Sequence, residues 1–154
     1  MYFRLRKDTE AWFNEVSSYF STKFDMYYFC AVVGFASGHK SPLEGSRATD
    51  LVDTFPREFR EKGRVLTGAL INAELKARGI ETNDRDDVHR LLGRLLSHQT
   101  PSRLSEEGMR LVNEYCSGGF EELSASFGDK PRSLSSFLVM FPKIVRSYRN
   151  EASS

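Results

Sequence analysis

The sequence predicts an all-α fold, a single-domain bundle of about six to seven helices. Apolar residues recur at helical spacing in most segments, and no segment shows sustained alternation of apolar and polar residues with β-branched side chains. A chain of 154 residues, 40% of them hydrophobic and 28% charged, suits one folded domain that buries roughly two-thirds of its unfolded surface. We expect residues 1–150 to form this domain and residues 151–154 to form a frayed tail.

The first two predicted helices carry much of the aromatic content of the chain. Helical spacing of aromatic residues predicts the first helix over residues 9–20. The second covers residues 23–37 and ends at Gly38, which suits a left-handed C-cap. It contains the apolar block 24–35 (FDMYYFCAVVGF). Because this block lacks a polar face, we expect its helix to be buried at the centre of the fold.

The middle of the chain combines a long loop with two amphipathic helices. Residues 39–53 are rich in serine, glycine, proline and charge and are the longest predicted loop. Residues 56–62 are expected to form a short helix or turn, and Gly63 precedes an amphipathic helix over 64–78. A second amphipathic helix is expected over 86–98, because Asn83 and Asp84 offer N-caps and acidic residues crowd its start. These two helices follow each other closely.

The C-terminal third is predicted to contain three further helical segments. Ser105 caps a helix that the pair Gly118-Gly119 is expected to stop, and a short helix over 120–127 follows. Ser133 caps the last helix, within which Pro142 predicts a kink or two abutting helices. The apolar stripe of this last segment comprises Leu134, Phe137, Leu138, Phe141, Ile144, Val145 and Tyr148. The helices expected to pack around the apolar block are those near 64–78, 86–98 and 134–148.

Composition limits the possible classes of function. Lysine and arginine number 22 and aspartate and glutamate 21, so a net charge of +1 gives no overall field that would draw the protein onto nucleic acid or membrane. Cys30 and Cys116 lie in apolar helical patterns and are expected to be buried thiols, as suits a reducing cytosol. The sequence contains no signal-peptide pattern and no run of ~20 apolar residues. We therefore expect a cytoplasmic protein without membrane association.

Catalytic and metal-binding patterns are missing from the sequence. His89 and His98 are nine residues apart, which misses the i, i+4 placement that brings two imidazoles to one metal. Neither cysteine has a CxxC partner or a neighbouring base. The pair Gly118-Gly119 lacks the GK[ST] sequence of a phosphate-binding loop. We therefore expect a non-enzymatic protein that uses no metal and no cofactor.

Two sets of residues are candidates for binding. The first set is basic: the folded chain could bring its members together on one face that contacts DNA phosphates. They are Arg90, Arg94, Lys143, Arg146 and Arg149. Segment 129–151 holds five basic and two acidic residues, a local excess of +3. The alternative is that these are ordinary solvated charges paired with acids. The N-terminal third has more aromatic residues than a small core commonly hides, which suggests a contact with a second copy or a larger protein. The candidate contact residues are Trp12, Phe13, Tyr27 and Tyr28.

Five stretches together resemble a known family of proteins. They are KFDMYYFCAVVGFASGHKS (23–41), LTGALINAELKARGI (66–80), LLSHQTPSRLSEEG (95–108), LVNEYCSGGFEEL (111–123) and SLSSFLVMFPKIV (133–145). The arrangement resembles small helical proteins that accompany bacterial DNA phosphorothioation and related phage-defence gene clusters. This resemblance implies an accessory or assembly subunit that acts through contacts with larger modification or restriction proteins. The alternative is a DNA-binding protein that uses a basic helical face without strong sequence preference.

Overall fold

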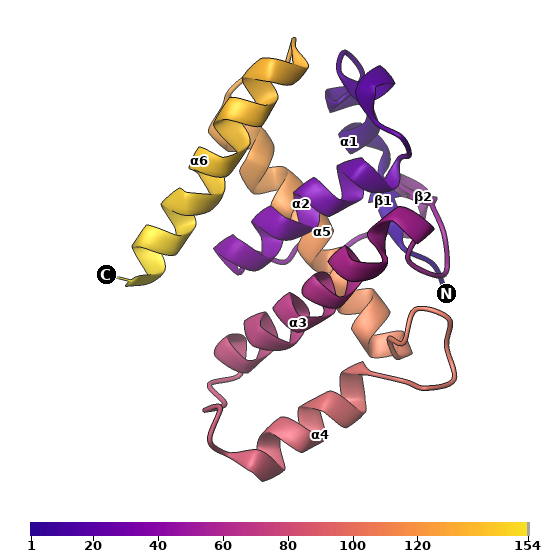
Figure 1. The fold of residues 1–154 in the computed structure, drawn as a ribbon, viewed down its shortest axis with the longest axis vertical. Helices are drawn as coiled ribbons and strands as arrows, with labels where there is room; N and C mark the ends of the chain where they lie inside the picture. The colour runs from indigo at the N-terminus through magenta and orange to yellow at the C-terminus, as the bar shows by residue number, and fades with distance from the viewer. Residues whose placement is uncertain (154) are drawn as a thin grey trace.

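Helices α2 (Phe24–Ser37) and α5 (Glu106–Phe127) cross at the centre of the computed structural model, which describes residues 1–153 (Figure 1). Six α-helices and one small two-stranded sheet form a single body that is 65% helical, which confirms the predicted mostly helical fold. The remaining elements are β1 (Arg4–Arg6), α1 (Lys7–Trp12), η1 (Ser17–Tyr19), η2 (Gly45–Arg47), β2 (Ala48–Asp50), η3 (Arg57–Phe59), α3 (Arg60–Ala77), α4 (Arg85–Leu95) and α6 (Leu134–Ser153). No helix in the described residues is both long enough and apolar enough to cross a lipid bilayer.

Close contact between α2 and α5 depends on glycines inside both helices. A Cβ atom built on Gly119 would lie less than 3.0 Å from the carbonyl oxygen of Cys30, and one on Gly34 would lie equally close to the carbonyl oxygen of Tyr115. Only glycine lets the two backbones approach so closely. The predicted stop at Gly118-Gly119 is therefore wrong: α5 continues through the pair, absorbs the predicted 120–127 helix, and ends at Gly128, whose φ is +76°.

A two-stranded sheet joins β1, which precedes the first predicted helix, to β2, which lies in the predicted loop 39–53. β1 and β2 are antiparallel, with Leu5 opposite Thr49. Leu5 is fully buried, and the backbone N–H of Arg4 donates a 2.9 Å hydrogen bond to Asn113 Oδ1 on α5. Three-residue strands are too short to show an alternating pattern, so sequence periodicity does not reveal them. Their anchoring to α5 explains why they form.

Several helix boundaries differ from the prediction. The first helix ends at Trp12, because the chain then turns through η1 and buries Phe13 and Val16. α3 begins at Arg60 and runs through Gly63, whose hydrogen leaves room for the ring of Phe55: a Cβ there would lie 2.6 Å from it. α4 ends at Leu95, three residues before the predicted end at residue 98, because Leu96 is already extended. The N-caps agree with the prediction. Asp84 caps α4 and accepts a hydrogen bond from the backbone N–H of Asp87, and Ser105 caps α5 and accepts one from the backbone N–H of Gly108.

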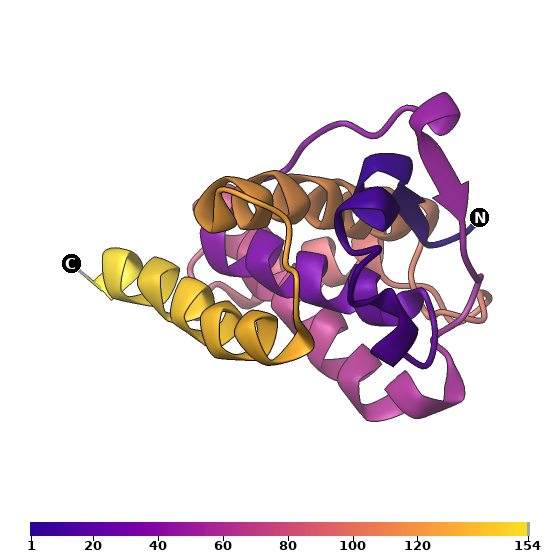
Figure 2. The ribbon, with the colours of Figure 1, turned by 90° about the horizontal axis from the view of Figure 1, so that it is seen from above.

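Helix α6 is one continuous helix with Pro142 inside it. It lies on the outside of the bundle, and its C-terminal end projects beyond the other helices (Figure 2). Of the residues predicted as a frayed tail, 151–153 continue this helix, and Ser154 lies outside the described residues.

The packing around α2 follows the prediction in part. α3 and α6 contact α2 as expected, whereas α4 packs on α3 and α5. The expectation that α4 packs against α2 is wrong: α3 lies between these two helices (Figure 1). Tyr27 and Val33 are fully buried, and Tyr28, Phe29 and Val32 are partly buried against the same core. Both thiols, Cys30 and Cys116, are buried and free, as predicted.

Candidate nucleic-acid interface

Four arginines line one hollow beside the start of α3. Arg57 comes from η3, Arg60 and Arg64 from the first two turns of α3, and Arg103 from the loop that joins α4 to α5. We call this site the arginine hollow; its volume is about 810 Å³. The remaining lining residues are Thr54, Phe55, Pro56, Gly63, Thr67, Pro101 and Ser102. In Figure 1 the start of α3 faces this loop on the side of the molecule that holds the N-terminus.

Helical spacing places the first wall of the hollow. Arg57, Arg60, Arg64 and Thr67 follow one another at intervals of three, four and three residues, which puts them on one face of a helix. The Thr67 hydroxyl donates a 2.9 Å hydrogen bond to the carbonyl oxygen of Gly63, one turn earlier. A different face of α3 buries Leu66 and Leu70 in the core. The arginine face therefore stays at the surface.

A constrained loop forms the opposite wall. Arg103 adopts a left-handed conformation with φ of +65°, the only positive φ outside glycine among the described residues. Its N–H donates to the carbonyl oxygen of Thr100 at 3.2 Å, and its own carbonyl oxygen accepts from Ser97 N–H at 3.0 Å. The Thr54 hydroxyl donates to the carbonyl oxygen of Pro101 at 3.3 Å, which ties the two walls together. These bonds hold Arg103 facing α3.

The hollow concentrates positive charge. Among the residues that the structure describes, no aspartate or glutamate lines it, and none of its four exposed arginines forms an ion pair. The N-terminal end of α3 adds the partial positive charge of a helix dipole. Guanidinium groups bind phosphate oxygens through two parallel hydrogen bonds. The site is therefore suited to a polyanion, and its volume is within the range of ligand-binding pockets.

The five basic residues predicted to contact DNA are not brought to one face. Arg90 pairs with Asp87 at 2.7 Å, and Arg94 pairs with Glu107 at 3.1 Å, so these two charges on α4 are compensated. Lys143, Arg146 and Arg149 are exposed on α6. α4 and α6 lie well apart in the fold (Figure 1), because α3 and α2 separate them. The structure thus divides the set between two surfaces.

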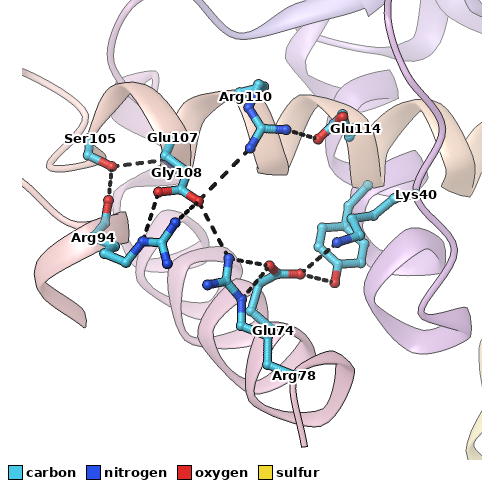
Figure 3. A network of polar contacts seen from close by, with 10 residues as sticks. Lys40, Glu74, Arg78, Arg94, Ser105, Glu107, Gly108, Arg110 and Glu114 are labelled. Carbon is cyan, nitrogen blue, oxygen red and sulfur yellow. Dashed lines mark hydrogen bonds and ion pairs between the residues drawn. The ribbon is translucent and has the colours of Figure 1, made fainter. Parts of the chain in front are cut away.

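A buried carboxylate anchors the helix that carries the hollow. Glu74 on α3 is only 1% exposed and accepts hydrogen bonds from Tyr115 Oη at 2.6 Å, Lys40 Nζ at 3.1 Å and Arg78 Nη2 at 3.0 Å (Figure 3). Burial alone would raise the pKa of Glu74, but these three donors outweigh burial and lower it. Burial is also the main cause that raises the pKa of Tyr115. Glu74 therefore remains a charged link between α3 and α5.

Arg78 extends this network to α4. Its guanidinium also lies 3.5 Å from Glu107 on α5, and Glu107 in turn pairs with Arg94 on α4 (Figure 3). Arg110 approaches the same carboxylate at 4.0 Å and pairs with Glu114 at 2.8 Å. The charges therefore join α3, α4 and α5.

The aromatic residues predicted to form an interface pack largely within the chain. Phe13 and Tyr27 are fully buried, and the hydroxyl of Tyr27 donates to Asn113 Oδ1 at 2.8 Å. Trp12 packs edge to face on Phe13 and on two phenylalanines of α5, Phe120 and Phe127. Tyr28 is partly buried against the core. Only Trp12 and Tyr28 of this set offer surface to a partner.

Sequence reasoning missed the arginine hollow for two reasons. The i, i+3, i+7 spacing of Arg57, Arg60 and Arg64 was readable, but the expected break at Gly63 divided it between two segments. Arg103 reaches the site only through the folding of a distant loop.

No family model, curated protein or solved structure matches this chain. In the described residues, no group of three or more histidine, cysteine, aspartate or glutamate side chains is placed to hold a metal ion.

Proposed function

We propose that this protein is a non-enzymatic nucleic-acid-binding protein that contacts the phosphate backbone at the arginine hollow. One observation carries the proposal: three arginines of the continuous helical stretch 57–64 and Arg103 of a distant loop line one surface, and the described lining contains no carboxylate. Binding to such a site releases condensed counterions, so affinity falls steeply as salt rises. Arginines that contact phosphates read no base sequence, so we expect little sequence preference.

The resemblance to accessory proteins of DNA phosphorothioation and phage defence supports a cellular context for this activity. We propose that larger subunits of such a system carry out the chemistry on DNA, while this chain attaches to the nucleic acid and to those subunits. The apolar residues exposed on α6, which include Leu138 and Val139, favour an additional protein contact.

The test is equilibrium binding measured by fluorescence anisotropy at low salt on duplex, nicked and single-stranded DNA. The double variant Arg60→Ala/Arg64→Ala is expected to bind every DNA more weakly by a similar factor, because phosphate contacts carry no sequence information. The matched control is Lys143→Ala/Arg146→Ala, which removes the same charge from exposed residues of α6. It is expected to retain wild-type affinity.

Two results would contradict the proposal. One is a wild-type protein that binds none of the three DNAs at low salt. The other is an α6 double variant that loses as much affinity as the α3 double variant, since this would assign the effect to net charge or to α6. Circular dichroism of each variant checks that the fold is unchanged.

A further inference from the structure

The arginine hollow has a buried floor and an exposed basic rim. Ser102 is only 3% exposed and Gly63 is also buried, and both residues line the hollow. The four arginines that line it are all exposed. A ligand group can therefore enter between the arginines, and it need not lie across the top of them.

The basic rim has two sides. Arg57, Arg60 and Arg64 follow one face of η3 and α3, and at a rise of about 1.5 Å per residue they lie within roughly 10 Å of one another along that face. Arg103 lies on the opposite wall, in the loop between α4 and α5. A groove that follows a nucleic-acid backbone spreads its charges along the path of the strand. Charges on two facing walls instead enclose one ligand group.

The phosphate at the end of a nucleic-acid strand suits such a two-sided site better than a phosphate within the strand. A terminal phosphate is a monoester, which has a charge of about −1.5 to −2 at pH 7 and three free oxygen atoms. A phosphate within a strand has a single charge and a sugar on each side, so the rest of the strand keeps it from entering a hollow. Because each guanidinium can bind two phosphate oxygens, several guanidiniums around one group favour the phosphate with more free oxygens and more charge.

We propose that the arginine hollow binds the terminal phosphate of a nucleic-acid strand, between the arginines of α3 and Arg103. This inference rests on the proposed function, because it names the part of the nucleic acid that occupies the same site. A free nucleotide carries the same phosphate monoester. A strand brings further phosphates to the exposed arginines of the rim, so it should bind more tightly than a nucleotide.

The experiment compares three forms of one short single-stranded oligonucleotide, which carry a phosphate at the 5′ end, a phosphate at the 3′ end, or hydroxyls at both ends. An internal fluorophore leaves both ends free, and fluorescence anisotropy measures the affinity. We expect the wild-type protein to bind at least one phosphorylated form about tenfold or more tightly than the hydroxyl form. Deoxyadenosine 5′-monophosphate, added as a competitor, is expected to bind more weakly than that oligonucleotide.

Arg103→Gly tests the second wall of the site. Glycine adopts a φ of +65° without strain, so this variant removes the guanidinium and keeps the conformation of the loop. It is expected to lose most of the preference for the phosphorylated form. Arg146→Ala is the matched control, because Arg146 is an exposed arginine of α6 that lines no part of the hollow. It is expected to keep the wild-type preference, and melting temperatures show that both variants fold.

Three outcomes would overturn the inference. They are equal binding of all three oligonucleotides, a folded Arg103→Gly variant that keeps the wild-type preference, and a nucleotide that binds as tightly as the phosphorylated oligonucleotide. If the hydroxyl form still binds the wild type and binds Arg60→Ala/Arg64→Ala more weakly, the proposed function survives the failure of this inference. If none of the oligonucleotides binds, both fail.

Discussion

Replacement of Gly119 by alanine tests the packing that organises the fold. The added Cβ would lie 2.6 Å from the backbone nitrogen of Gly34 and still nearer to the carbonyl oxygen of Cys30. Both atoms belong to the backbone of α2, so no side-chain rotation relieves the clash and the two helices must separate. Overpacking of a well-packed core costs about 1–3 kcal/mol, and occasionally more. Because the obstacle here is backbone, we expect a cost of about 3 kcal/mol.

Differential scanning calorimetry measures this effect. For a domain of this size each kcal/mol shifts the melting temperature by about 2–4 °C, so Gly119→Ala should melt about 6–12 °C below the wild type. Gly68→Ala is the matched control in another helix, because a Cβ there meets no atom within 4 Å. It should stabilise the protein by about 0.5–1 kcal/mol through helix propensity. A Gly119→Ala variant with the same melting temperature as the wild type would refute backbone contact between α2 and α5.

Three further predictions concern the buried polar network and the thiols. Tyr115→Phe removes one donor from buried Glu74 and should lower the free energy of unfolding by about 1–3 kcal/mol in urea titrations; an unchanged value would show that the bond contributes nothing. Because the folded pKa of Glu74 is lowered, its charge stabilises the protein above the ordinary carboxyl pKa, and this contribution is lost as pH falls through the folded pKa. The difference in melting temperature between the wild type and Glu74→Gln should therefore shrink in acid, whereas a constant difference would contradict the role of the charge. Cys30 and Cys116 are both buried, and burial raises the pKa of Cys116. Neither thiol should therefore react with a thiol reagent in native protein, and both should react in urea; rapid native labelling would contradict their burial.

Features decided by local chemistry were predictable from the sequence. Asp84 and Ser105 cap their helices as expected, and Gly38 ends α2 in the left-handed conformation. The apolar block 24–35 is the centre of the core because no face of it suits water. These features depend on neighbouring residues along the chain, which the sequence displays directly.

Features decided by contacts between distant segments were not predictable from the sequence. A glycine pair ends many helices, and only the presence of α2 against α5 explains why Gly118 and Gly119 continue one. The strands around Leu5 and Thr49 are stabilised by their position on α5. The arginine hollow combines a readable helical stripe with Arg103, which the loop after α4 supplies.

The salt dependence of DNA affinity tests the central proposal most directly. The logarithm of the binding constant should fall linearly with the logarithm of salt concentration, with a slope of about −0.9 for each phosphate contact. If Arg60 and Arg64 contact phosphates, their replacement by alanine should reduce this slope by up to about two units, and the Lys143→Ala/Arg146→Ala control should keep the wild-type slope. An unchanged slope in the Arg60→Ala/Arg64→Ala variant would contradict phosphate binding at the arginine hollow.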